Sequence, residues 1–261
     1  MKKQEKDVVY IDENLKGEVV AVEDNDFMYE DAGMGTEGAD EKSFATPFLT
    51  VLQGLSPQLE YLDNARVGNI INTLTEEVYK EAFVIPCGFQ RRYLRWGNRN
   101  TGGGFKGEYN PVQVENGEVE GVTRTPDGKL TIDGDDLKDT RNHFVLVRSN
   151  NGSWQPAIIS LSSTQIKKSK RWMSLIQSCE FKTKEGKKFT PPSFANIYKI
   201  GSQKEENSKG SWHGITVELS EKVSEKELYE AAKEFSLKVS KGEVKMAAPE
   251  ADSGVELNET F

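Results

Sequence analysis

The residues best suited to chemistry in this sequence are cations mixed with aromatic rings. The densest group lies within nine positions and consists of Arg91, Arg92, Tyr93, Arg95, Trp96 and Arg99. Side chains of an extended strand alternate between its two sides, so one side collects Arg91, Tyr93 and Arg95. Because arginine is rarely buried, we expect this side to be an open platform rather than part of a core.

Further mixtures of the same kind occur later in the chain. They comprise Phe105, Lys106, Lys167, Lys168, Lys170, Arg171, Tyr198, Lys199 and Trp212. Single-stranded nucleic acid requires both types, because cations neutralise its phosphates and aromatic faces stack on its bases. The alternative is that the large aromatic residues belong to the core and that the lysine-rich stretch is an ordinary solvated helix face.

Residue types that perform catalysis are sparse. The two histidines, His143 and His213, do not have the spacing of a metal site, and the glycine loop "TGGGFKG" lacks the ending of a phosphate loop. We therefore predict no enzyme activity, no metal and no cofactor. The carboxylates of "DGDD", residues 133–136, leave a metal-dependent nuclease as a weaker alternative, with Asp135 as the residue to test.

The net charge of -8 is distributed unevenly. Residues 1–43 carry five basic and 13 acidic residues, residues 44–218 carry 23 and 19, and residues 219–261 carry six and ten. A mildly basic centre between acidic ends favours a polyanionic partner, although acidic ends can also serve solubility alone. No apolar run approaches the roughly 20 residues of a membrane span, and the two cysteines lie far apart. We expect a cytoplasmic protein with reduced thiols and no membrane partner.

The elements that position these residues are predicted to be mainly β-strands with flanking helices. We expect one strand near residues 82–96, two near 143–161 and two near 194–219, with a helix over 162–178 between the third and fourth strands. This is the order of the OB-fold, a five-stranded Greek-key barrel. A mixed β-sandwich with packed helices would give much of the same pattern.

The same reading divides the chain into four parts. Residues 1–43 form an acidic, largely disordered segment, and residues 44–219 form the OB-fold-like domain. Residues 220–242 contain a C-terminal helix, and residues 243–261 form a flexible acidic tail that ends in Phe.

The tail carries a family resemblance. A basic barrel-like body followed by an acidic tail with Glu256, Glu259 and a terminal Phe261 resembles the single-stranded DNA-binding proteins of bacteria and tailed bacteriophages. The resemblance covers the coarse strand order of residues 44–219 and the last dozen residues. It implies that Glu256, Glu259 and Phe261 dock on replication or recombination proteins.

We therefore predict non-catalytic, sequence-tolerant binding of single-stranded DNA in phage or bacterial DNA replication and recombination. If the protein is phage-encoded, its place is the cytoplasm of the bacterial host. The alternative is a virion structural or assembly protein whose aromatic strands form contacts between subunits. A homo-oligomer is compatible with either function.

Overall fold

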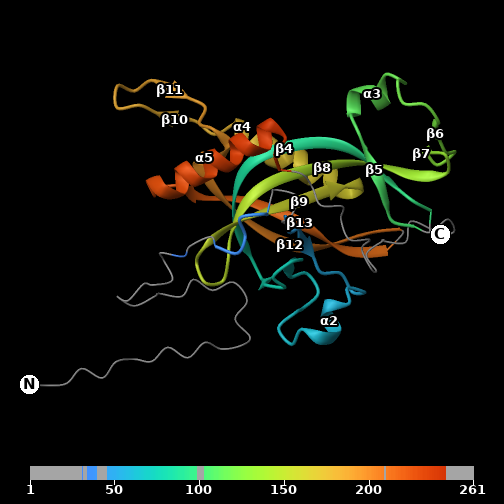
Figure 1. Cartoon of the computed structure of the whole chain (residues 1–261), viewed down its shortest axis with the longest axis horizontal. Coiled ribbons are helices and arrows are strands. Elements are labelled where there is room, and N and C mark those ends of the chain that lie inside the picture. The colour runs from blue at the N-terminus through green and yellow to red at the C-terminus, as the bar shows by residue number, and fades with distance from the viewer. Residues whose placement is uncertain (1–30, 32–33, 40–45, 99–102, 209, 245–261) are drawn as a thin grey trace, which may run out of the picture.

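Two long antiparallel strands, β4 (Ala82–Trp96) and β8 (Asp135–Arg148), form the centre of the molecule (Figure 1). The computed structural model describes residues 31, 34–39, 46–98, 103–208 and 210–244. β4 occupies the residues predicted for the first strand, where branched and aromatic side chains favour extended backbone. The prediction of a mainly β protein with flanking helices is confirmed, and the sheets are antiparallel.

Six further strands join β4 and β8 in the large sheet. They are β5 (Phe105–Tyr109), β6 (Val122–Arg124), β7 (Leu130–Ile132), β9 (Trp154–Ser162), β12 (Asn196–Asn207) and β13 (Gly210–Lys222). In the body of the protein the order of pairing is β9, β8, β4, β12, β13. The far ends of β4 and β8 continue beyond this body and pair with β5 and β7. We call residues 91–98 and 103–139 the arm.

Smaller elements surround the sheet. A second sheet contains β1 (Leu49–Val51), β2 (Ile70–Asn72) and β3 (Val78–Tyr79), and a separate hairpin contains β10 (Phe181–Lys182) and β11 (Lys188–Phe189). The helices are α2 (Gln58–Tyr61), α3 (Pro111–Glu115), α4 (Ile166–Gln177) and α5 (Lys226–Lys241), with short 3-10 turns at Ser163–Gln165 and Ser193–Ala195. α4 lies between β9 and β12 in the chain, as predicted.

The predicted closed barrel is not confirmed. β9 and β13 stand at the two ends of the five-strand order and do not pair with each other. The segment around β1 fills the space between them: Phe48 forms a parallel bridge with Ile158 of β9. On the other side, the amide of Gln53 accepts a hydrogen bond from the His213 backbone N–H and donates one to its carbonyl, both at 2.9 Å. A side chain thus satisfies main-chain groups that a neighbouring strand would otherwise bind.

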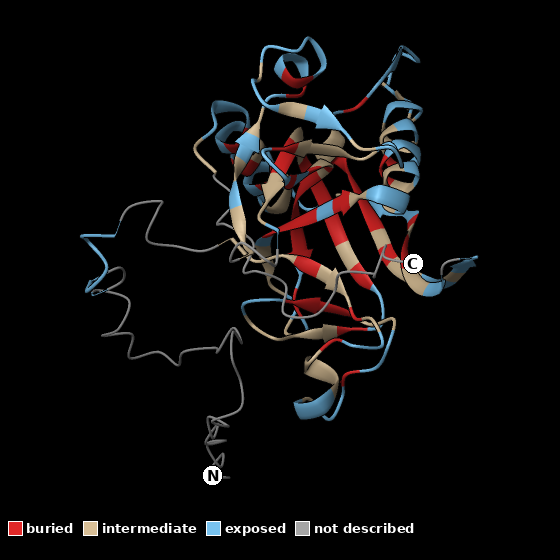
Figure 2. Cartoon of the chain, turned by 90° about the vertical axis from the view of Figure 1, so that its right-hand side faces the viewer, coloured by how far each residue is buried: buried red, intermediate tan, exposed pale blue. Residues whose placement is uncertain are grey.

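The sheet is buried on both faces. On one face Val84, Val145 and Ile200 enclose the fully buried Trp172 of α4. On the other face Phe235 of α5 packs on Phe144 and other apolar residues of the central strands. Figure 2 shows the buried residues running along the strands, while the helices expose their outer sides. The two helices are therefore fixed to the sheet from opposite faces, and α4 can present only its outer side.

Within the described residues, every helix is too short or too polar to cross a membrane.

Candidate nucleic-acid interface

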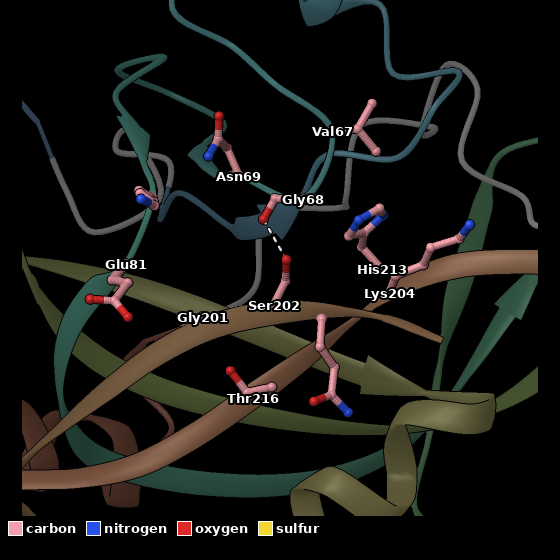
Figure 3. A pocket seen from close by; sticks show the side chains of 11 residues that line it. Val67, Gly68, Asn69, Glu81, Gly201, Ser202, Lys204, His213 and Thr216 are labelled. Carbon is pink, nitrogen blue, oxygen red and sulfur yellow. Dashed lines mark hydrogen bonds between the residues drawn. The ribbon is translucent and has the colours of Figure 1, made fainter. Parts of the chain in front are cut away.

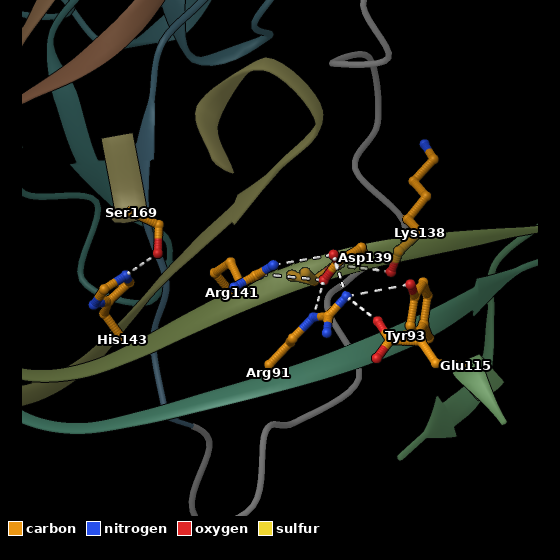
Figure 4. Close-up of polar contacts among 9 residues, drawn as sticks. Arg91, Tyr93, Glu115, Lys138, Asp139, Arg141, His143 and Ser169 are labelled. Carbon is orange, nitrogen blue, oxygen red and sulfur yellow. Dashed lines mark hydrogen bonds and ion pairs between the residues drawn. The ribbon is translucent and has the colours of Figure 1, made fainter. Parts of the chain in front are cut away.

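The arginine face of β4 is occupied by carboxylates from neighbouring elements (Figure 4). Arg91 binds both oxygens of Asp139 on β8, at 2.9 Å and 2.8 Å, and lies 2.7 Å from Glu115 of α3. Burial alone would raise the pKa of Asp139, but hydrogen bonds from Arg91 and Arg141 outweigh it and lower that pKa. The prediction of an open arginine platform is therefore wrong in one respect, because Arg91 is neutralised within the arm.

A second ion cluster holds the end of the arm. Asp135 is buried and accepts hydrogen bonds from Lys106 at 2.9 Å and from Arg95 at 2.6 Å. These two cations lower the pKa of Asp135 to about 2. Arg95 also lies 3.4 Å from Asp133, and Arg92 lies 3.6 Å from Glu108. Arg92, Arg95 and Lys106, which the sequence predicted to bind phosphates, therefore form ion pairs with carboxylates of the arm.

The arm's aromatic residues pack against other side chains of the protein. Tyr93 is buried among Val114, Ile132 and Leu137, so its ring cannot stack on a base in this conformation. Trp96 and Phe105 are half-buried and pack edge to face, with ring centroids 5.8 Å apart.

The predicted site residues of β12 and β13 are also largely engaged. Tyr198 is 1% exposed and lies in the core, so the prediction that it stacks on a base is wrong. Lys199 lies 3.1 Å from Glu81 and 3.2 Å from Glu218. Trp212 is half-buried.

Helix α4 keeps the basic surface that the sequence predicted. Lys167, Lys170 and Arg171 are exposed on one helical face, following the spacing of three and four residues. No carboxylate of the described chain pairs with these three cations, whereas Lys168 is ion-paired with Glu205. The face is outward because the opposite face is anchored: Trp172 stacks on His143, with ring centroids 4.3 Å apart.

The anchor of α4 also removes His143 from acid–base chemistry. Its Nε2 lies 2.8 Å from the Ser169 hydroxyl, and both residues are buried. Burial, assisted by the nearby Arg141, lowers the pKa of His143 to about 3. The imidazole is therefore neutral at physiological pH and serves packing.

The β10–β11 hairpin is a basic and aromatic element that the sequence reasoning missed. Lys182, Lys184, Lys187 and Lys188 are all exposed, and Phe189 is 44% exposed. Phe181 packs edge to face on Phe189 at 6.0 Å and lies under Lys222 at 4.7 Å, which holds the base of the hairpin. In Figure 1 the hairpin projects from the body.

The helix and the hairpin follow each other in the chain and form one basic segment. Residues 163–192 contain eight basic and two acidic residues, a net charge of +6 in a chain whose total is -8. One of these acids, Glu180, lies 2.6 Å from Lys188. We call the outer face of α4 together with the β10–β11 hairpin the basic platform.

Comparison with known proteins supplies a family. The family described as Pam3 phage gp34-like protein matches residues 16–245, which is most of the chain. The chain belongs to this family. No curated protein and no solved structure matches it.

In this member of the family, the described residues contain no cluster of three or more histidine, cysteine or acidic side chains that could hold a metal ion. The carboxylate proposed for the nuclease alternative, Asp135, already binds Lys106, Arg95 and the backbone N–H of Asn98. Four residues named from the sequence, Arg99, Glu256, Glu259 and Phe261, lie outside the described residues.

Proposed function

We propose that this protein binds single-stranded DNA without sequence preference and that the basic platform is the binding surface. The observation that carries this proposal is the combination on residues 163–192: a net charge of +6, an exposed phenylalanine, and exposed cations such as Lys170 and Lys184 that pair with no carboxylate of the described residues. Cations bind the phosphates of a strand, and an aromatic face stacks on its bases at about 1–3 kcal/mol per base.

The strand connectivity supports the proposal. Counting β4, β8, β9, β12 and β13 as five successive strands, the first pairs with the second and the fourth, and α4 lies between the third and fourth. A partly open five-stranded barrel with this helix position is the OB-fold, a common fold for oligonucleotide binding. We propose the chain as a divergent, open form of that fold.

The family match to a phage protein supports a role in a bacterial host cell. We place the protein in phage DNA replication or recombination, as a non-catalytic component without a cofactor. Residues Glu256, Glu259 and Phe261 would recruit partner proteins, in line with the resemblance to tailed single-stranded DNA-binding proteins.

Titration of fluorescein-labelled oligo-dT, followed by fluorescence anisotropy, tests the proposal. We expect saturable binding whose affinity falls steeply as salt rises, because each phosphate contact releases a counterion. A protein that forms large assemblies in light scattering and shows no affinity for oligo-dT at low salt would instead be the virion assembly component. Cleavage of the oligonucleotide in Mg²⁺, lost in Asp135→Ala, would favour the nuclease.

A further inference from the structure

A hollow lies where the loop before β2 meets the β12–β13 hairpin. Its volume is about 330 Å³, and its walls include Gly68, Asn69, Lys80, Lys204, His213 and Thr216 (Figure 3). These residues come from four separate parts of the chain: the loop, the β3–β4 turn, β12 and β13. None of them belongs to the basic platform.

The fold fixes one wall of the hollow closely. Lys204 is directly opposite His213 in the β12–β13 pairing, so both side chains leave the same face of the hairpin. Ser202, two residues before Lys204, donates a hydrogen bond to the carbonyl of Gly68. Gly68 has a φ of +89°, and a Cβ there would lie 2.8 Å from the His213 ring. Only glycine lets the loop approach this closely.

The charged residues of the lining that form no ion pair within the described residues are basic. Lys80 and Lys204 are exposed, and neither has a carboxylate partner in the part of the chain that the structure describes. The acidic residue of the lining, Glu81, is already paired with Lys199 at 3.1 Å. Figure 3 shows the Glu81 carboxylate directed away from the side chains of Ser202 and His213.

The remaining polar groups of the lining are suited to donate hydrogen bonds. The Asn69 side-chain oxygen accepts from the backbone N–H of Arg66 at 2.8 Å, which leaves the amide nitrogen available. Thr216 contributes a hydroxyl, and His213 contributes a ring nitrogen. The lining therefore combines two cations with three further polar side chains, contributed by four separate parts of the chain.

We propose that this hollow binds a phosphate group. A phosphate offers three strong acceptor oxygens that point in different directions, which matches donors from several chain segments better than a planar carboxylate does. The group can come from a free nucleotide or from the terminal phosphate of a nucleic-acid strand. The site is separate from the basic platform and does not depend on DNA binding there.

Histidine-ring NMR tests the site directly, because the chain has two histidines and only His213 lines the hollow. Titration with inorganic phosphate should move the His213 ring signal saturably. The signal of His143 should stay constant, because that ring is buried against Trp172. Sodium chloride of equal ionic strength should leave both signals in place. The double substitution Lys80→Gln and Lys204→Gln should weaken phosphate binding at least about tenfold, because it removes two charge-assisted hydrogen bonds.

A matched double variant, Lys182→Gln and Lys184→Gln, removes the same charge from the β10–β11 hairpin. It should keep phosphate binding while losing affinity for oligo-dT, so failure of one proposal is distinguishable from failure of the other. If the Lys80→Gln and Lys204→Gln variant has a lowered melting temperature, Thr216→Val gives a second test. This substitution should also weaken phosphate binding. Saturable binding of dTMP, with no preference between the 5′-phosphorylated and 5′-hydroxyl forms of an oligonucleotide, identifies a free nucleotide as the source of the phosphate. Preference for the 5′-phosphorylated form identifies a strand end. No saturable movement of the His213 signal, or equal movement in the double variant, would overturn the site.

Discussion

The triple substitution Lys182→Gln, Lys184→Gln and Lys187→Gln removes three exposed cations from the β10–β11 hairpin. It breaks no ion pair of the described chain. Each phosphate contact to a single strand contributes about 0.7 to the slope of log affinity against log salt. Three lost contacts should therefore reduce that slope by about 2. At about 0.1 M monovalent salt this corresponds to about 100-fold weaker binding, or about 2.8 kcal/mol.

The assay is anisotropy of labelled oligo-dT of about 16 nucleotides, the upper end of the site size of one OB-fold, between about 50 and 200 mM salt. The matched control removes the same charge from α5 by glutamine at Lys233, Lys238 and Lys241, each of which is paired with a neighbouring glutamate. The control variant should keep the wild-type slope. An unchanged slope in the hairpin variant, or an equal loss in both variants, would show that the hairpin does not contact phosphates.

We expect three other outcomes. Phe189→Ala should weaken oligo-dT binding by about 1–3 kcal/mol in the same assay, while Phe189→Tyr should retain it; equal weakening by both would exclude stacking. The pKa of Asp135 is lowered to about 2 by Lys106 and Arg95, so its contribution to the free energy of unfolding should be complete above about pH 4 and lost as pH falls toward 2. Thermal melts across this range should show a shallower acid limb in Asp135→Asn than in wild type, and identical limbs would contradict the linkage. Deleting residues 258–261 should preserve or strengthen DNA binding and weaken recruitment of partner proteins in pull-downs; loss of DNA binding by the folded truncation would argue against this role for the tail.

Local sequence patterns were sufficient to predict the main strands and helices. β4 begins and ends at the predicted residues because its run of branched and aromatic side chains is long, and α4 was visible from the change to helical spacing at Ile166. The β10–β11 hairpin was missed because strands of two residues have no measurable period. Its only signal was the pair Glu185-Gly186 between two short basic and aromatic runs.

Local sequence patterns could not show whether the arginine side chains of β4 are open or neutralised by carboxylates. Arg91 and Tyr93 do lie on one side of β4, as the alternation predicted, since the guanidinium approaches the ring to 5.4 Å. The carboxylate that neutralises Arg91 is Asp139, which is brought opposite by the register of β8. A contact that spans 48 residues depends on pairing, which the pattern of one strand does not contain.

The absence of a closed barrel among the described strands has a similar explanation. The order of the main elements along the chain was predictable. Whether the sheet closes depends on what meets the edges of β9 and β13. Gln53 binds the main chain of His213 there, and Gln165 accepts a hydrogen bond from the backbone N–H of Ile215 at 3.0 Å. Single glutamine side chains give no signal of edge binding in a sequence.

The proposed function requires that single-stranded DNA lies on residues 163–192. Photo-crosslinking of the full chain to an oligonucleotide containing 5-iododeoxyuridine, followed by peptide mass spectrometry, locates the strand directly. We expect adducts on the β10–β11 hairpin, with Phe189 the main position, and their loss at high salt. Adducts confined to the arm, or no adduct under conditions of low salt, would contradict the account.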